Sequence, residues 1–180
     1  TLKTIAKKLV TGKCDLILAI ATDSAQAVAA ETTEIPILFT AVTDPVTAKL
    51  VQSNEKPDTN VTGTNDMNPV KEQVELLQKL APKAKRIGVV YNAGEVNSVV
   101  QVDMVKESAS KAGLKVVEAT VSNTSEVMQA AQSLVGRVDT FYIPTDNTVS
   151  SSVESIIKVA EANALPVVVG EAAMVERGAL

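Results

Sequence analysis

Histidine is absent from the 180 residues, and cysteine occurs only once, at Cys14. The lack of histidine excludes catalytic triads and general bases built on imidazole, and it excludes most zinc sites. A single cysteine cannot form an internal disulfide. Its place just before an apolar run favours a small buried side chain over a reactive thiol. The sequence shows no nucleophile–base pair, and we expect no metal, no cofactor and no enzymatic activity.

Aromatic residues make up only 2% of the chain, and the net charge is -4 without a basic cluster. These features argue against binding to nucleic acid or to an anionic membrane surface. Neither a G-x-G-x-x-G motif after a strand nor G-x-x-x-x-G-K-[ST] occurs, so phosphate-binding loops lack support. No apolar stretch is long enough to span a bilayer, and the chain opens on an amphipathic segment instead of a signal peptide.

The sequence does contain 46% hydrophobic residues, arranged in alternating strand-like and helix-like segments. Such alternation is typical of parallel sheets wound by β–α–β units, and it predicts an α/β fold. We expect the last four strands to form one parallel sheet with helices on both faces. The predicted strands are 16–20, 37–39, 61–63, 86–91, 114–121, 140–143 and 167–169, and the main predicted helices are 2–10, 24–31, 69–80, a segment ending at 111, 125–136 and 151–163.

Three of the apolar runs are followed at once by a Thr-Asp pair, namely Thr22-Asp23, Thr43-Asp44 and Thr145-Asp146. Parallel strands end at one edge of a sheet, and ligands bind beyond that edge, where the next helices begin. Capping of the following helix is the simpler explanation for any single pair. Repetition over several loops, with Asn97 and Ser98 at the start of another helix, makes ligand binding an equal alternative for the group.

Several segments occur in an order and spacing that resemble one family: "ILAIATDSAQAV", "IPILFTAVTDPV", "VTGTND", "RIGVVYNAGEVNSVVQ", "FYIPTDNTV" and "VERGAL". Along essentially its whole length the chain resembles the substrate-binding proteins of ABC transporters, in the group whose characterised members bind aromatic amino acids. The resemblance implies a two-lobed type I periplasmic-binding-protein architecture with the ligand in the cleft. It also implies an ABC permease as partner and an extracytoplasmic location, either periplasmic or as a membrane-anchored lipoprotein.

The resemblance also implies a domain organisation. Residues 1–66 correspond to part of lobe one, 67–84 to a crossover helix and linker, and 85–180 to lobe two. Family members carry an earlier strand and helix, and a C-terminal part that returns to lobe one. We therefore expect a truncated architecture with uncovered apolar surface on lobe one. Such a chain alone is expected to bind ligand weakly or not at all and to self-associate.

An amino acid, with tryptophan or phenylalanine favoured, is the expected ligand. Its carboxylate needs N–H donors and positive potential, which the helix beginning near Ser24 offers. Its ammonium group needs an acceptor, for which Asp146 is the first choice, with simple capping as the alternative. The candidate ligand-binding residues are Thr22, Asp23, Ser24, Ala25, Thr43, Asp44, Asn97, Ser98, Asp146, Asn147 and Glu171.

Two other functions stay open from the sequence. Transcription regulators and receptors use the same two-lobed architecture as a ligand-sensing domain, and a DNA-binding module elsewhere in the gene would identify a regulator. An α/β enzyme is the third possibility, and chemical turnover of the ligand would identify it.

Overall fold

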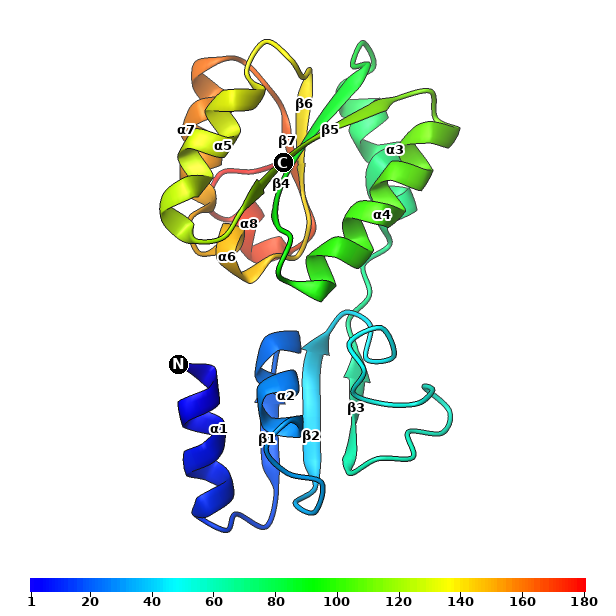
Figure 1. Cartoon of the computed structure of the whole chain (residues 1–180). Helices are drawn as coiled ribbons and strands as arrows, with labels where there is room; N and C mark the ends of the chain where they lie inside the picture. Colours follow the sequence, from blue (N-terminus) through cyan, green and yellow to red (C-terminus); the bar gives the residue numbers. More distant parts are fainter. The chain divides into compact units, whose positions relative to one another are not determined.

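The computed structural model describes all 180 residues, which form two compact units, Thr1–Met67 and Asn68–Leu180 (Figure 1). Each unit contains one β-sheet, and every strand pair in both sheets is parallel. The α/β fold predicted from the alternation of strands and helices is therefore confirmed. The helix after Met67, which the sequence assigned to a crossover segment, lies within the second unit.

The first unit has a three-stranded sheet in the order β1-β2-β3. Helix α2 packs on β1 and β2, and α1 lies against α2 (Figure 1). The central strand β2 meets β3 through a pairing of Phe39 with Gly63, and the register shifts between Phe39 and Val42. The bounds are α1 (Leu2–Thr11), β1 (Ile17–Ile20), α2 (Thr22–Ala29), β2 (Ile37–Val42) and β3 (Val61–Asn65).

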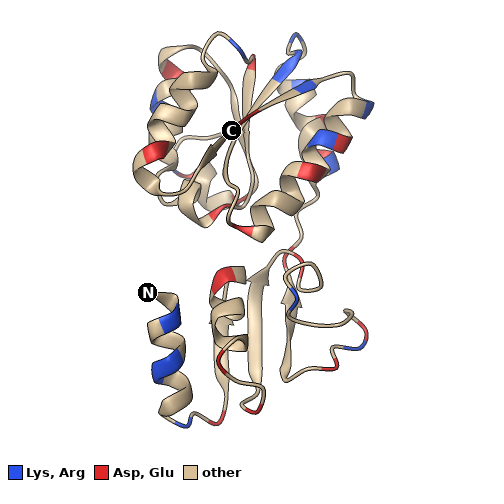
Figure 2. Ribbon diagram, viewed as in Figure 1, with Lys and Arg blue, Asp and Glu red and all other residues tan.

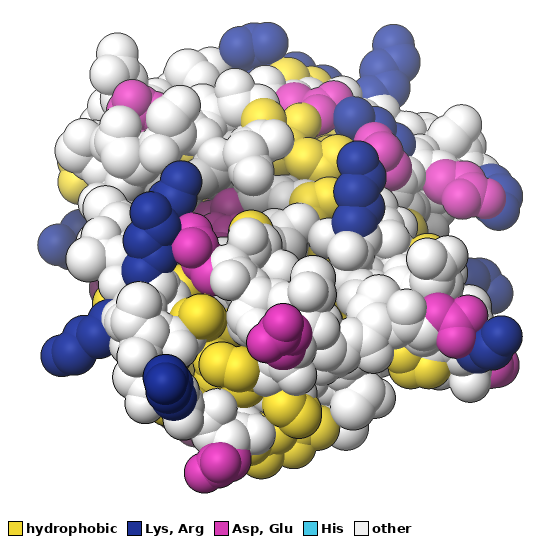
Figure 3. Space-filling view, turned by 60° about the horizontal axis from the view of Figure 1, so that its bottom comes forward, with side chains coloured by type: hydrophobic (Ala, Val, Ile, Leu, Met, Phe, Trp, Pro, Cys, Tyr) yellow, Lys and Arg dark blue, Asp and Glu magenta, His cyan; other side chains and the backbone are white.

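Strand β1 has one covered face and one open face. Ile17 and Ala19 are buried, whereas Leu18 is 63% and Ile20 is 60% exposed. Leu38 of the neighbouring strand is exposed as well. Exposed hydrophobic side chains are visible among the charged ones in the space-filling view (Figure 3). Parallel sheets usually have both faces covered, so this open apolar face is a surface on which further protein can pack. Self-association of the chain stays a prediction.

The second unit has a four-stranded parallel sheet in the order β5-β4-β6-β7, as predicted for the last four strands. Helices α3 and α4 cover one face, and α5 and α7 cover the other (Figure 1). The bounds are α3 (Val70–Leu80), β4 (Arg86–Asn92), α4 (Val96–Lys111), β5 (Lys115–Val121), the 3₁₀ turn η1 (Thr124–Glu126), α5 (Val127–Leu134), β6 (Thr140–Ile143), α6 (Asn147–Ser150), α7 (Val153–Ala162), β7 (Val167–Val169) and α8 (Ala172–Val175).

The core of the second unit consists of two apolar layers, one on each face of the sheet. Strand alternation separates them, because Phe141 and Ile143 face α5 and α7 while Tyr142 faces α3 and α4. All three side chains are fully buried. The Tyr142 hydroxyl donates to Gln73 Oε1 at 2.6 Å, so the buried ring keeps a polar partner. Both faces of this sheet are covered, which fixes the loops at its carboxyl edge on a rigid support.

Two helix boundaries differ from the prediction. Helix α2 begins at Thr22 instead of residue 24, so the first Thr-Asp pair lies inside the helix. The helix predicted over 151–163 corresponds to α7, and a separate short helix, α6, precedes it; the two are divided at Ser152, which leaves the helical region at φ -138 and ψ 23. The third Thr-Asp pair therefore precedes α6 directly, and Asp146 is the N-cap of that short helix.

No helix combines the length and apolar character needed to cross a membrane. Lys and Arg side chains are dispersed over helices and loops of both units instead of forming one basic stripe (Figure 2). The dispersal agrees with the lack of a basic cluster in the sequence.

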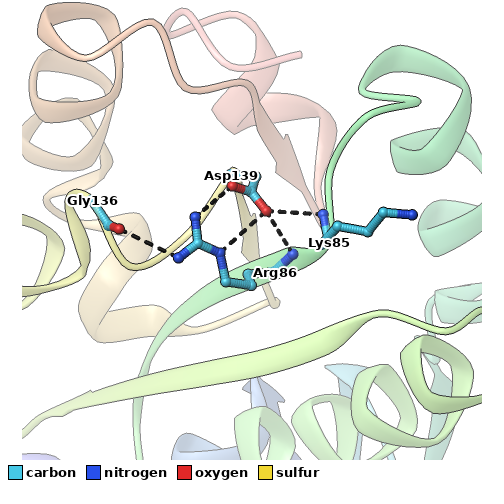
Figure 4. Close-up of polar contacts among 4 residues, drawn as sticks. All are labelled: Lys85, Arg86, Gly136 and Asp139. Atoms are coloured by element: carbon cyan, nitrogen blue, oxygen red, sulfur yellow. Dashed lines mark hydrogen bonds and ion pairs between the residues drawn. The ribbon is translucent and has the colours of Figure 1, made fainter.

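At the amino edge of the second sheet, Asp139 joins the starts of β4 and β6 (Figure 4). Its Oδ2 accepts from the N–H groups of Lys85 and Arg86, each at 2.9 Å, and from Arg86 Nε at 3.3 Å. Its Oδ1 accepts from Arg86 Nη2 at 2.7 Å, and Arg86 Nη1 also donates to the Gly136 carbonyl. The guanidinium hydrogen bonds and the backbone N–H groups lower the pKa of Asp139 to about 2.

We expect Asp139→Asn to destabilise the protein at neutral pH. An amide cannot accept on both sides, so its NH2 group would face an Arg86 donor. The side chain is 30% exposed, and after allowance for screening the change costs about 1–2 kcal/mol. Since folding lowers this pKa from 3.8, the contribution is present above that value and is lost as pH falls toward about 2.

Urea unfolding at pH 7 and at pH 2.5 measures this effect. The midpoint of Asp139→Asn should lie below that of the parent at pH 7 and approach it at pH 2.5. Glu161→Gln, at an exposed position of α7, is the control and should change neither midpoint. A constant difference between Asp139→Asn and the parent at both pH values would contradict the assignment.

Candidate functional site

The carboxyl edge of the second sheet gathers polar residues from three loops. Strands β4 and β6 are neighbours in the sheet, so the loops that follow them lie side by side. The loop after β4 carries Glu95, the loop after β6 carries Thr145 and Asp146, and Gly170 and Glu171 follow β7. Ligands of open α/β sheets bind beyond this edge.

Glu95 lies just before α4 but bonds to the start of α6. Its Oε2 accepts from Asn147 N at 2.8 Å and from Asn147 Nδ2 at 2.7 Å. Its Oε1 accepts from Thr148 N at 2.9 Å and from the Thr148 hydroxyl at 2.7 Å. The residue is only 3% exposed. A buried carboxylate needs this many donors, because an unpaired charge is costly to bury.

Asp146 makes the opposite connection, from the loop after β6 to the end of β4. Its Oδ2 accepts from Asn92 N and from the Ser98 hydroxyl, each at 2.7 Å. Its Oδ1 accepts from Val149 N at 2.7 Å, which caps α6. The side chain is buried, with 1% of the residue exposed. Capping is therefore one role of Asp146, and a ligand contact by its carboxylate stays a prediction.

Asn97 lies in the first turn of α4, next to Glu95 and Thr145. Its Nδ2 donates to the Thr145 carbonyl at 2.9 Å and lies 3.3 Å from Glu95 Oε2. This arrangement assigns the orientation of the amide, because its NH2 group faces acceptors. Asn97 Oδ1 is buried and has no hydrogen-bond partner in the protein. Buried acceptors are nearly always satisfied, so this oxygen lacks the donor that such a position normally has.

Thr145 is also hydrogen-bonded by two residues that the sequence analysis did not name, Gln101 and Asn68. Its N–H donates to Gln101 Oε1 at 3.0 Å, and Asn68 Nδ2 donates to its hydroxyl oxygen at 2.5 Å. Gly170 lies against this network, since a Cβ there would come within 3.0 Å of both Asn68 Nδ2 and Thr145 N. Glu171, the last predicted site residue, accepts from the Ser150 hydroxyl at 2.5 Å.

The two buried carboxylates have opposite pKa shifts. Burial raises the pKa of Asp146 above its usual range, and the nearby charge of Glu95 adds to this effect. Burial also opposes ionisation of Glu95, but the Thr148 hydroxyl and the N–H groups of Asn147 and Thr148 lower its pKa overall. Neither carboxylate belongs to an ion pair. The edge therefore combines negative charge with an unused amide oxygen, which suits a cationic group such as an ammonium.

In the first unit, the predicted residues at the end of β1 form the first turn of α2. Thr22 and Ala25 are buried, and Ala25 N donates to the Ala21 carbonyl within the helix. Ala21 is the N-cap residue, with φ 72 and ψ 157 and no side-chain cap. Such a conformation costs a non-glycine residue about 1–3 kcal/mol. Thr22 and Asp23 are thus inside the helix and do not occupy its N-cap position.

The second Thr-Asp pair follows β2. Asp44 accepts from Val46 N at 3.1 Å, from Thr47 N at 3.3 Å and from the Thr47 hydroxyl at 2.6 Å. These bonds hold the turn after Pro45. Because β1 and β2 are adjacent parallel strands, both pairs of the first unit lie at the same edge of its sheet.

Hydrogen bonds thus connect four of the predicted residues in the second unit: Asn97, Ser98, Asp146 and Asn147. Glu95 lies at the centre of this group, although the sequence analysis did not include it in the site. Its position between a strand and a helix, beside Asn97 and Ser98, was the available signal. The acceptor that fixes Thr145, Gln101, gave no signal, because it lies within a helix between apolar residues.

The sequence model of the ABC transporter substrate binding protein family matches residues 1–180. The chain belongs to this family. It is 51% identical to the tyrosine-binding protein of Clostridioides difficile strain R20291, over 100% of this chain and 52% of that protein. This ABC substrate-binding chain therefore spans about half the length of that relative.

Two solved structures are similar to this ABC substrate-binding chain over 99% of its length. One is the ABC domain in complex with L-Trp from Streptococcus pneumonia, with a TM-score of 0.97, 38% identity and 61% of that chain covered. The other is a conserved domain protein from Vibrio cholerae, with a TM-score of 0.97, 45% identity and 60% of that chain covered. The α/β architecture is that of type I periplasmic binding proteins, as the sequence resemblance implied.

Proposed function

We propose that the full-length protein carrying this chain is the extracytoplasmic solute-binding component of an ABC importer, and that it captures an aromatic amino acid without changing it. The observation that carries the proposal is the carboxyl edge of the second sheet. Two buried carboxylates lie there outside any ion pair, next to an amide oxygen without a protein partner. The tyrosine-binding and L-Trp-bound relatives favour an aromatic side chain on the ligand.

We assign the two charged groups of the amino-acid ligand to different residues. The α-ammonium group is assigned to the acidic group around Asp146, Asn97 and Asn147. The α-carboxylate is assigned to the first turn of α2, because the start of a helix offers N–H donors and positive potential. Thr43, Asp44 and Glu171 are proposed to line the ligand. An ABC permease is the proposed partner of the loaded protein.

A thermal-shift screen of the full-length protein tests the proposed function. A ligand present at 100 times its Kd stabilises the folded state by about 2.7 kcal/mol. Since 1 kcal/mol shifts Tm by about 2–4 °C in a protein of 150–250 residues and by less in a longer one, we expect L-tyrosine or L-tryptophan to raise Tm by about 3 °C or more. L-Leucine and the D-enantiomers should raise it less.

The recovered ligand is then analysed by mass spectrometry. A solute-binding protein returns it unchanged after prolonged incubation, whereas an enzyme produces a second compound. The proposal fails if none of the aromatic amino acids shifts Tm, or if the bound compound is converted.

A further inference from the structure

Glu95 occupies an unusual position for a capping carboxylate. It is the N-cap residue of α4, yet its side chain caps no backbone N–H of that helix and meets it only through Asn97 Nδ2, at 3.3 Å. All of its strong contacts go to the start of α6, through Asn147 and Thr148, at 2.7–2.9 Å. The carboxylate thus ties the loop after β4 to the loop after β6.

The two loops hold each other reciprocally. Glu95 reaches from the first loop to α6, and Asp146 reaches from the second loop back to Asn92 N and the Ser98 hydroxyl. Asn92 Nδ2 also donates to the Thr148 hydroxyl oxygen at 2.9 Å. Removal of the Glu95 carboxylate would therefore leave N–H donors at the start of α6 without an acceptor. Removal of the Asp146 carboxylate would do the same to donors in β4, α4 and α6.

The same contacts fix the orientation of two side-chain amides, those of Asn97 and Asn147. Asn147 Nδ2 donates to Glu95 Oε2 at 2.7 Å, and Asn97 Nδ2 lies between Glu95 Oε2 and the Thr145 carbonyl. With their NH2 groups held this way, both residues keep the amide oxygen on the side away from Glu95. Asn97 Oδ1 has no protein partner, and Asn147 is an exposed residue. Glu95 itself is buried and has its oxygens occupied.

We propose that Glu95 is a positioning residue for ligand recognition: it sets the orientation of the Asn97 and Asn147 amides so that their oxygens accept from the α-ammonium group of the ligand, without touching the ligand itself. This inference rests on the proposed function. It predicts that Glu95 controls how strongly the protein distinguishes an amino acid from the same molecule without its amino group.

Glu95→Gln is the decisive variant. A carboxamide keeps the size but replaces one acceptor oxygen with an NH2 group, which would face the donors of either Asn147 or Thr148. The probes are L-tyrosine and 3-(4-hydroxyphenyl)propionate, which lacks the ammonium group, and both affinities are measured by calorimetry in the full-length protein. The informative quantity is the Kd for 3-(4-hydroxyphenyl)propionate divided by the Kd for L-tyrosine.

We expect Glu95→Gln to lower this ratio at least about tenfold, mainly by weakening the binding of L-tyrosine. If Glu95 had only a structural role, Glu95→Gln would lower Tm or weaken the binding of both probes by the same factor. The ratio would then not change. Glu126→Gln is the matched control, because Glu126 also accepts from a backbone N–H and an Asn side chain, at 2.7 and 2.8 Å, but these belong to Ser122 and Asn123 in the turn after β5 and not to the candidate site. It should leave the ratio unchanged.

A second variant covers the case in which Glu95→Gln does not fold. Glu95→Asp keeps the charge but retracts it by one methylene, so it cannot reach both Asn147 and Thr148, and the ratio should fall again. An unchanged ratio in a folded variant of either kind overturns the proposal. Failure of the parent protein to bind L-tyrosine or L-tryptophan counts instead against the proposed function.

Discussion

Asp146→Asn should weaken the binding of L-tyrosine by the full-length protein at least about tenfold, which corresponds to about 1.4 kcal/mol. The substitution removes a negative charge that the proposed site directs at the α-ammonium group. Charge-assisted hydrogen bonds contribute about 1.5–3 kcal/mol when water is excluded, so loss of the charge alone reaches this size. Isothermal titration calorimetry at pH 7 measures the change.

The structure adds a stability cost to this prediction. An Asn side chain can satisfy either Val149 N, or Asn92 N and the Ser98 hydroxyl, but its NH2 group then faces the remaining donor. In a position that is only 1% exposed, such an orphaned donor costs about 1–3 kcal/mol of folding free energy. Both Tm and Kd must therefore be recorded.

Asp139→Asn provides the control, because it is the same chemical change at the amino edge of the same sheet. It should lower stability and leave Kd for L-tyrosine as in the parent. If Asp146→Asn lowers Tm but binds L-tyrosine as tightly as the parent, Asp146 acts only as a cap, and its assignment to the ligand is withdrawn.

Acidification should reproduce, in the parent protein, part of the loss of L-tyrosine affinity expected for Asp146→Asn. Burial raises the pKa of Asp146, so its charge disappears at a higher pH than that of an ordinary aspartate. Affinity that depends on the charge is present above this raised pKa and is lost as pH falls through it. In Asp146→Asn this component of the pH profile should be missing.

Gly63→Ala should destabilise the first unit by about 3–5 kcal/mol, at the upper end of what single substitutions do. A Cβ at position 63 would lie 2.0 Å from the Phe39 carbonyl oxygen and 2.7 Å from the Phe39 ring. The backbone oxygen belongs to the central strand and cannot swing away like a side chain. Strands β2 and β3 must therefore separate, and Phe39, now 4% exposed, would lose its packing.

Urea unfolding followed by far-ultraviolet circular dichroism measures this loss. Gly12→Ala is the matched control in the same unit: Gly12 ends α1 at φ -72 and ψ -4, ordinary angles for alanine, and a Cβ there would lie 3.2 Å from the Lys8 carbonyl oxygen. It should change stability far less than Gly63→Ala, because this contact needs a shift of only a few tenths of an ångström and alanine also restricts the unfolded chain. Equal midpoints for the two variants would show that β3 does not approach β2 as closely as described.

Most of the fold could be predicted from the sequence because its signals are local. The apolar runs at 140–143 and 167–169 coincide with β6 and β7, since continuous β-branched and aromatic residues between turns leave few alternatives. The short helix α6 could not be predicted in the same way. Glu95 accepts from the N–H groups of Asn147 and Thr148 at its start, a contact between residues far apart in the sequence.

Prediction of the candidate site from the sequence has the same limit, because local signals do not show contacts between distant residues. Asp146, Asn97 and Ser98 were recognised because they follow strands, where ligand loops occur. Glu95 was not placed in the site, because the donors that surround it come from the start of α6, some 52 residues away in the chain. Burial and partners of a polar side chain are tertiary properties, and residue type and spacing alone do not specify them.

The reciprocal bonding of Glu95 and Asp146 has a consequence for local opening of the protein. Neither loop can leave the sheet edge without breaking the hydrogen bonds that stabilise the other, so the two loops form one cooperative unit. Amide protons on both loops, such as Asn92 N and Thr148 N, should then exchange with solvent at a common rate. A change of ligand preference achieved at exposed positions of either loop would leave this shared framework intact, which makes those positions suitable for engineering of selectivity.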